Sequence, residues 1–403
     1  MPDDRALAEA FEITRLSPGF AQDPFPTYRA LLKHAPVKQF EDGSVMVARY
    51  ADLMRIYRDT RTFSSDKKAE FLPKYGDTPL YEHHTTSLVF NDPPLHTRVR
   101  RIMSGALTPR AIAAMEEGLV ALVDRLLSEL PDPCDLIEHY ASAIPVEVIG
   151  NLFDMPHDER GPLRDWSLAI LGALEPVLAP DQHIRGNSAV TGFCDYLRDL
   201  VARRREAPGD PETDVLTRLM QGDRGEHLTE SELLQNCIFI LNAGHETTTN
   251  LIGNALDLLL DFPDERQRLL EDPSLIDLAV EEVLRHQSSN QLGNRITTQD
   301  CEIGGLQIEP GTRVHLLMGA ANRDPDQFPD PDRFDVARTP NRHLAFAGGP
   351  HICLGLTLAR LEGRVAIERF LSRYPDYRRD GAGVRTGRVR FRGFAHLPVR
   401  LSA

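Results

Sequence analysis

Apolar residues recur every three or four positions over several long stretches of the chain, and this spacing predicts amphipathic helices. The clearest stretches are residues 111–130, 196–205, 275–285 and 354–374. Short runs typical of strands occur at residues 45–47, at 301–308 around the turn Gly304-Gly305, at 313–317 and near 389–401. The pattern therefore predicts a mainly α fold with small β-sheets at its margin.

The longest predicted helix covers residues 229–260, about 45 Å at the rise of an α-helix. Thr229 and Glu232 have the spacing of a capping box at its start. Its polar middle, residues 242–250, is typical either of a solvated helical face or of a groove that binds a small molecule. The acid and alcohol of Glu246 and Thr247 favour the groove. Gly244 also favours it, because an inner glycine costs a helix about 1 kcal/mol relative to alanine.

The composition is that of a globular protein, with 41% hydrophobic and 26% charged residues among 403. No repeat or Gly/Ser linker interrupts the chain, so we expect one domain over residues 1–403. No apolar run reaches the roughly 18 residues of a membrane span, and the first residues lack a signal-peptide pattern. We therefore expect a cytoplasmic protein without membrane contact. The net charge of -14 argues against a nucleic-acid partner.

Five cysteines are scattered along the chain without a C-x-x-C pair, so neither a disulfide framework nor a zinc site is expected. Cys353 differs from the others because glycines surround it and an amphipathic helix follows it. Gly348, Gly349 and Gly355 allow close backbone approach, and a helix N-terminus stabilises a negative sulfur. A buried core thiol is the ordinary alternative. This setting instead suits a thiolate that ligates haem iron and promotes O–O cleavage.

The loop around Cys353 resembles the cysteine loop of the cytochrome P-450 haem-thiolate monooxygenases, in particular their soluble bacterial members. Phe346, Gly349, Cys353 and Gly355 fill the family pattern Phe-x-x-Gly-x-x-x-Cys-x-Gly, whereas Ala347 stands where the family usually has glycine. The resemblance extends over essentially the whole chain. It implies the cytochrome P-450 fold, with haem b between the long central helix and the cysteine-loop helix. It also implies that Cys353 is the axial iron ligand and that Phe346 and Gly349 lie beside the haem.

The segment 92–100 resembles the part of the family whose histidine and arginine pair with a haem propionate, here His96 and Arg100. Haem is apolar except for its two carboxylates, which need cationic or hydrogen-bonding partners when they are buried. Arg295 and His351 are expected to complete this group of propionate partners.

The segment 243–248 resembles the oxygen-activation stretch of the family's central helix. The resemblance implies that Ala243 and Gly244 lie against the haem. Thr247 is expected to hold oxygen and water, and Glu246 to relay protons, because O–O cleavage needs two protons that are not drawn from bulk solvent. This acid and alcohol pair separates the family's dioxygen-using members from its peroxide-using ones.

Glu282 and Arg285 fit the family's Glu-x-x-Arg, and Arg333 fits the third member of the same ion-pair network. An isolated pair at i and i+3 of a helix is a weak surface pair. With Arg333 added, the triad is expected to stabilise the fold around the cysteine loop without touching substrate.

The resemblance places the substrate pocket at residues 83–90, 171–183, the region near Ala243, residues 289–294 and residues 393–396. Candidate contacts with substrate in or near these segments are Asn242, Ala243, Leu88, Ser289, Asn290, Leu292 and Phe394. Their polar members indicate a substrate with a hydroxyl, carboxylate or carbonyl group, since an unpaired buried donor costs about 1 to 3 kcal/mol. The alternative is that these side chains bond to backbone or water.

No flavin, iron–sulfur or reductase motif occurs in the chain, so electrons are expected from a separate ferredoxin and its NAD(P)H-dependent reductase. Arginines near the expected cysteine side form a candidate basic patch for an acidic ferredoxin, or else a solvated surface: Arg98, Arg101, Arg110, Arg360 and Arg364.

The leading hypothesis is a monomeric monooxygenase that hydroxylates or oxidatively dealkylates a small organic molecule. Two alternatives remain: a catalytically silent haem protein, and a helical ligand-binding protein without haem.

Overall fold

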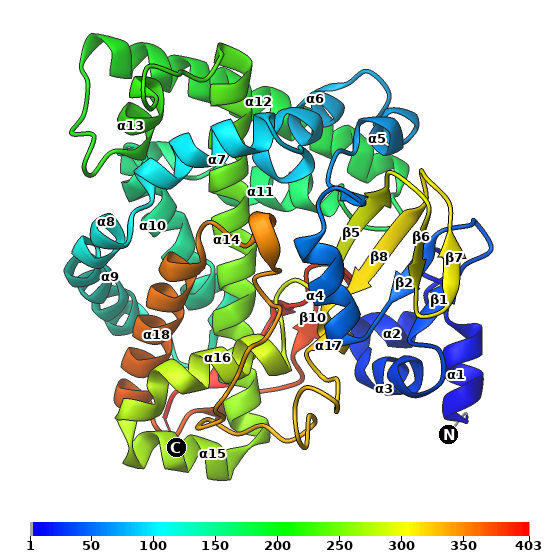
Figure 1. Ribbon diagram of the computed structural model, residues 1–403. Helices are drawn as coiled ribbons and strands as arrows, with labels where there is room; N and C mark the ends of the chain where they lie inside the picture. The colour runs from blue at the N-terminus through cyan, green and yellow to red at the C-terminus, as the bar shows by residue number, and fades with distance from the viewer. Residues whose placement is uncertain (1–2, 403) are drawn as a thin grey trace.

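A 32-residue helix, α14 (Glu230–Asp261), runs through the middle of the computed structural model, which describes residues 3–402 (Figure 1). The predicted capping box is confirmed: Thr229 Oγ1 accepts the Glu232 N–H at 3.2 Å, and the Glu232 carboxylate accepts the Thr229 N–H at 2.8 Å. Almost every side chain from Leu233 to Leu259 is buried. The polar middle of α14 is therefore not a solvated face.

Helices from most of the chain pack around α14, and the largest hydrophobic core surrounds it. The helices in contact with it are α6 (Pro79–Thr86), α10 (Ala143–Leu152), α11 (Leu163–Gly172), α12 (Pro180–Glu206), α13 (Val215–Gln221), α15 (Pro263–Glu271), α16 (Ile276–His286) and α18 (Leu356–Arg373). The other α-helices are α1 (Asp4–Ala10), α2 (Pro18–Gln22), α3 (Phe25–His34), α4 (Tyr50–Arg58), α5 (Lys68–Tyr75), α7 (Leu95–Ala106), α8 (Pro109–Ala114), α9 (Glu116–Glu129) and α17 (Met318–Ala321). Within residues 3–402, no helix combines the length and apolar character needed to cross a membrane.

The predicted helices are present, with two differences in extent. The stretch 111–130 is divided between α8 and α9 at Met115. The stretch 196–205 is only the second half of α12, which begins at Pro180. Gly186 lies in the first half, where glycine is an unfavourable helix residue. It is a packing position, because a Cβ there would meet Leu80 Cδ1 at 2.8 Å.

A five-stranded sheet lies to one side of the helices, with α1 to α3 near its lower end in Figure 1. Its strand order is β1 (Val37–Gln39), β2 (Val45–Val47), β8 (Arg313–Leu317), β5 (Leu292–Thr297) and β3 (Phe63–Ser64). Strands β2 and β8 are parallel, whereas β5 runs antiparallel to β8 with Arg295 opposite Val314. The sheet therefore presents Leu292 and Asn294 on one face of β5 and Arg295 on the other.

The predicted short strands near residues 45–47, 301–308, 313–317 and 389–401 are confirmed, and all belong to small sheets. The hairpin of β6 (Cys301–Ile303) and β7 (Leu306–Ile308) turns at Gly304 and Gly305, which both have positive φ. The remaining sheets pair β10 (Val384–Arg385) with β11 (Phe394–His396), and β12 (Pro398–Arg400) with β4 (Cys134–Asp135) and β9 (Arg378–Arg379).

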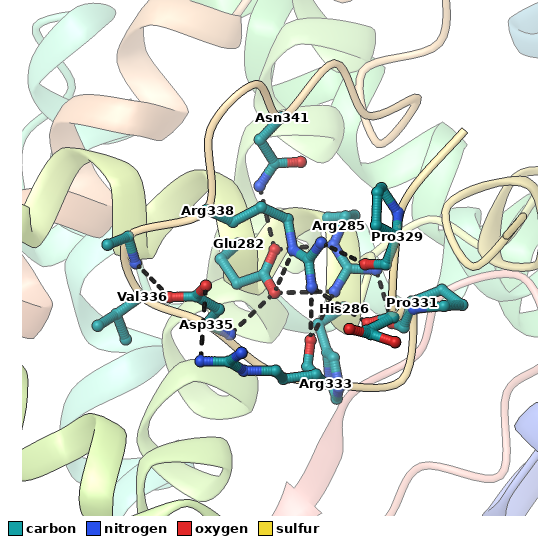
Figure 2. Close-up of polar contacts among 12 residues, drawn as sticks. Glu282, Arg285, His286, Pro329, Pro331, Arg333, Asp335, Val336, Arg338 and Asn341 are labelled. Atoms are coloured by element: carbon teal, nitrogen blue, oxygen red, sulfur yellow. Dashed lines mark hydrogen bonds and ion pairs between the residues drawn. The ribbon is translucent and has the colours of Figure 1, made fainter. Parts of the chain in front are cut away.

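A buried ion-pair network joins α16 to the irregular segment 329–341, which leads into the cysteine loop (Figure 2). Glu282 and Arg285 are fully buried and form two hydrogen bonds, of 2.7 and 2.8 Å. Arg285 also donates to the carbonyl oxygens of Asn322, Pro331 and Arg333. The network therefore fixes a loop that has no regular backbone pairing of its own.

The prediction that Arg333 supplies the third side chain of this network is wrong. Its side chain is 61% exposed and faces Asp335. Arg338 occupies the place instead, with its Nε 3.1 Å from Glu282 Oε1 and its Nη2 donating to the Arg333 carbonyl oxygen at 2.9 Å (Figure 2). Arg333 thus contributes a backbone oxygen, because the turn that begins at Asp330 directs its side chain to solvent.

Replacing Arg338 by glutamine tests this assignment. We expect Arg338→Gln to lower the free energy of unfolding by about 2 kcal/mol, because Glu282 loses a charged donor while remaining buried. The matched Arg333→Gln should stay within about 0.5 kcal/mol of wild type. Denaturant unfolding followed by circular dichroism measures both. Equal losses in the two variants would contradict the exchange of roles.

Candidate haem and oxygen-activation site

The cysteine loop closes on itself directly before α18. The Cys353 N–H donates to the Phe346 carbonyl oxygen at 3.0 Å, and the Ile352 N–H donates to that of Gly349 at 3.1 Å. Gly349 has a φ of 64°, and a Cβ there would lie 2.1 Å from the Tyr57 carbonyl oxygen of α4. Only glycine fits this contact, which fixes the half-buried thiol at the start of α18.

Ala347 has a φ of 58°, in the left-handed region that disfavours a residue with a Cβ. Glycine adopts this φ without strain, which agrees with the glycine that the family usually has at this position. The loop keeps its hydrogen bonds despite the strain, and the Ala347 N–H donates to the Leu344 carbonyl oxygen at 2.8 Å.

The surroundings of Cys353 favour a negative sulfur only in part. Burial raises the pKa of the Cys353 thiol, while the Gly355 N–H and the guanidinium groups of Arg100 and Arg360 lower it. A thiolate at this depth needs a further positive partner, which a bound iron provides.

The four predicted propionate partners lie together. The rings of His96 and His351 have centroids 3.9 Å apart. The positive charges of Arg295 and Arg100 act on both histidines, although burial is the larger cause that lowers the pKa of His96 to about 4 and that of His351 to about 2. Both imidazoles are therefore neutral at pH 7, and each offers one N–H to an acceptor.

Several nitrogens of this group are buried without a hydrogen-bond partner in residues 3–402: His96 Nε2, His351 Nε2 and Arg295 Nε. Unpaired buried donors are costly, so a partner from outside the chain is expected. Two carboxylates of a bound haem fit this donor set, and the thiol of Cys353 fits its iron. The residues present therefore match haem.

The central stretch of α14 exposes a single stripe. Phe239, Ala243 and Thr247, spaced by four residues, are half-buried, as is Gly244, whereas their other neighbours on the helix are buried. Thr247 Oγ1 donates to the Ala243 carbonyl oxygen at 2.6 Å. A Cβ at Gly244 would meet Ile149 Cδ1 of α10 at 2.8 Å. This glycine allows α10 to pack closely on α14.

Glu246 forms an ion pair with Arg388, a partner that the sequence did not indicate. Arg388 Nη1 lies 2.6 Å from each Glu246 carboxylate oxygen, and Arg388 Nη2 donates to the Leu168 carbonyl oxygen at 2.7 Å. Burial raises the pKa of Glu246 to about 7, although Arg388 opposes this rise. No sequence pattern singled out Arg388, because residues 389–390 form a bend and the arginines at 388, 390 and 392 bind different groups.

A cavity of about 600 Å³ opens next to β5, and three of the five predicted pocket segments line it. They contribute Phe90, residues 174–180 with His183, and Leu292 with Asn294. Of the individually predicted contacts, only Leu292 lines this cavity.

The other candidate contacts lie elsewhere. Leu88 and Phe394 belong to the hydrophobic core, and the Phe394 ring lies 3.6 Å from the guanidinium carbon of Arg385, so Phe394 does not face the cavity. The Asn290 amide oxygen accepts the Leu292 N–H at 3.3 Å, which is the backbone bonding foreseen as an alternative. The side chains of Asn242 and Ser289 are buried, and neither amide atom of Asn242 nor Ser289 Oγ has a partner in the described part of the chain.

Four of the five arginines expected to form a basic patch are neutralised by ion pairs. Arg98 pairs with Glu232, Arg101 with Asp223 and Glu226, Arg360 with Glu281, and Arg364 with Glu116. Arg110 is exposed and lacks an ion pair within residues 3–402. The five residues therefore do not form the strongly positive surface that was expected.

Comparison with known proteins identifies the family. The family model for Cytochrome P-450 matches residues 171–375. The Vitamin D(3) 25-hydroxylase of Pseudonocardia autotrophica is 39% identical, over 89% of this chain and 88% of its own length. The Biotin biosynthesis cytochrome P-450 of Bacillus subtilis is 34% identical, over 88% of this chain and 90% of its own length.

A solved structure shows the same fold. The crystal structure of P450BioI in complex with an acyl carrier protein ligated to hexadec-9Z-enoic acid superimposes with a TM-score of 0.89 at 32% identity. The match covers 96% of this chain and all of that one. Together with the cysteine loop and the cluster of propionate partners, these similarities show that the chain belongs to the cytochrome P-450 family, and that it is a monooxygenase with haem b as its cofactor.

Proposed function

We propose that this enzyme hydroxylates or oxidatively dealkylates a small organic substrate, with electrons from a separate ferredoxin and its NAD(P)H-dependent reductase. The observation that carries the proposal is the pair on α14. Thr247 lies on the accessible stripe, and the neighbouring Glu246 is buried with a pKa near neutrality. A catalytically silent protein has no need of a buried acid beside an accessible hydroxyl. Family membership excludes the alternative of a protein without haem.

The chain's own residues hold the cofactor in this proposal. Cys353 ligates the iron, while His96, Arg100, Arg295 and His351 bind the propionates. Bound haem b supplies the redox chemistry, in which dioxygen and two electrons yield one oxygen atom for the substrate and one for water. That balance requires two protons, and the residues of α14 supply them.

Thr247 and Glu246 divide the proton supply between them. Because the Thr247 hydroxyl donates to the Ala243 carbonyl oxygen, its own oxygen remains free to accept a hydrogen bond from water. Burial raises the pKa of Glu246 to about 7, so its carboxyl group exchanges protons readily near neutral pH. Arg388 holds the carboxylate in place between transfers.

Replacing Cys353 tests the iron ligand. We expect Cys353→Ala to abolish the long-wavelength absorbance of the reduced carbon monoxide complex, because that band requires a thiolate ligand. Cys301→Ala, which removes another half-buried cysteine, should leave the band unchanged. An unaltered band in Cys353→Ala would refute the assignment.

Replacing Thr247 tests the proton supply. We expect Thr247→Ala to keep haem and substrate binding but to lower product formed per NAD(P)H by about tenfold or more, with the electrons recovered as hydrogen peroxide. Parallel assays of NAD(P)H, peroxide and product measure this.

Thr249→Ala is the matched control, because Thr249 Oγ1 donates to the His245 carbonyl oxygen at 3.0 Å in the same way but from a buried face. Full coupling in Thr247→Ala, or equal uncoupling in both variants, would contradict the role of Thr247.

A basic surface other than the expected one supports a ferredoxin as the electron donor. Arg58 and Arg342 are exposed beside a crevice that Tyr50 and Met54 of α4 also line. Neither arginine forms an ion pair with any described residue. Because Gly349 packs on the backbone of Tyr57 and Arg58, this crevice adjoins the cysteine loop. An acidic partner that docks here approaches the thiolate side of the site.

Reversing one of these charges tests the docking surface. We expect Arg58→Glu to lower the second-order rate of reduction by an acidic ferredoxin about tenfold at low salt, with a smaller difference at high salt. Arg205→Glu makes the same charge change at the exposed end of α12 and should have little effect. Stopped-flow reduction under carbon monoxide measures the rates. A reduction rate that is independent of salt and of Arg58 would remove the support for this surface.

The proposal extends to domain organisation, assembly and location. The similarity to a solved structure over 96% of the chain supports one monooxygenase domain over residues 1–403. A monomer in the cytoplasm, without nucleic acid as a partner, stays a prediction.

A further inference from the structure

The cavity beside β5 has walls of two kinds. Phe71, Phe90 and Leu292 contribute apolar surface. Lys74 of α5 and Arg390, in the segment before β11, contribute cations. A mixed wall of this type fits a ligand that has one charged end and an apolar body.

Lys74 and Arg390 meet at one corner of this cavity. Lys74 Nζ donates to the Glu175 carbonyl oxygen at 3.0 Å, and Arg390 Nε donates to that of the preceding residue, Leu174, at 3.0 Å. Among residues 3–402, neither cation forms an ion pair with a carboxylate, and Arg390 Nη2 has no hydrogen bond. Burial, and then the charge of Arg390, lowers the pKa of Lys74 to about 8. The negative charges of Glu70 and Glu175 oppose this fall in pKa, but neither lies within ion-pair distance of Lys74 or Arg390.

The acids around the cavity already have other partners. Asp42 lies 3.0 Å from Arg313, and Glu70 lies 3.2 Å from Lys67. The carboxylate of Glu175 accepts the backbone N–H groups of residues 389 and 390. These acids do not move to neutralise Lys74 and Arg390 without breaking those contacts.

A count of the charges in and beside the cavity leaves one positive charge. Three cations (Lys74, Arg313, Arg390) and three carboxylates (Asp42, Glu70, Glu175) line the cavity, and the buried Lys67 beside Glu70 adds the fourth cation. His315 adds none at neutral pH, because burial lowers its pKa to about 4. Arg295, on the opposite face of β5, belongs with the haem propionates.

We propose that this corner binds the carboxylate of the substrate between Lys74 Nζ and Arg390 Nη2. The inference rests on the proposed monooxygenase function and names its substrate class as carboxylic acids with an apolar body. One surplus positive charge matches a carboxylate, whereas a phosphate monoester brings about two negative charges. The apolar body lies along Phe90 and Leu292, next to the strand that also bears Arg295 of the haem group.

Ligand titrations of the ferric holoenzyme test the proposal through the haem absorbance shift that substrate binding produces. The probes are unbranched carboxylic acids from octanoic to octadecanoic acid, each with its methyl ester. We expect the preferred acid to bind about ten- to a hundredfold more tightly than its ester, as for a charge-assisted hydrogen bond. In Lys74→Met the acid should lose most of this advantage while the affinity of the ester stays unchanged.

Lys33→Met is the matched control, because Lys33 is exposed on α3 and pairs with Asp4. It should behave as wild type. Lys74 is preferred over Arg390 for the test because Arg390 also binds two backbone carbonyl oxygens, and its loss endangers the fold. The thiolate carbon monoxide band of Lys74→Met confirms an intact haem site.

Three results would overturn the carboxylate site: no shift with any acid of the series, equal affinities for acid and ester, or an equal loss of both in Lys74→Met. None of these bears on whether the enzyme is a monooxygenase. The proposed function fails separately, if a compound that binds and shifts the spectrum gives no oxygenated product with dioxygen and electrons.

Discussion

The close approach of the cysteine loop to α4 determines the geometry of the whole site. Gly349 lies against the Tyr57 carbonyl oxygen with no space for a Cβ. This contact sets where Cys353 stands at the start of α18, and it brings His351 onto His96 of α7. The buried network of Glu282 fixes the segment that leads into the loop. Three elements distant in sequence thus define one thiolate position.

Charge burial is the second constraint on the site. The chain buries neutral histidines and an arginine whose nitrogens lack partners within residues 3–402, which is costly unless a ligand completes them. A bound haem completes both groups of residues at once, since its iron binds the Cys353 sulfur and its carboxylates bind the buried nitrogens. Folding and cofactor binding are therefore energetically linked, because the holo state removes costs that the apo state retains.

Local sequence patterns were enough for the elements and for residues inside compact motifs. The capping box of α14 follows from spacing and residue type alone. The cysteine loop and the four propionate partners were expected because their segments resemble those of the family. Arg338 and Arg388 could not be identified in this way. Each binds a carboxylate that is distant in the sequence, and the sequence does not show which of the many arginines lies beside that carboxylate. Arg333 was mistaken for Arg338 because a turn, not a helix, decides which side chain points inward.

Arg388 and Arg390 are two residues apart in the irregular segment before β11, and they face different parts of the site. Arg388 anchors the carboxylate of α14, whereas Arg390 reaches the cavity. An insertion or deletion of one residue here would move both guanidinium groups together. Evolution of this segment toward other ligands is consequently restricted to substitutions that keep the backbone register. Relatives with altered loops at this point should also have changed how they hold the acid of the central helix.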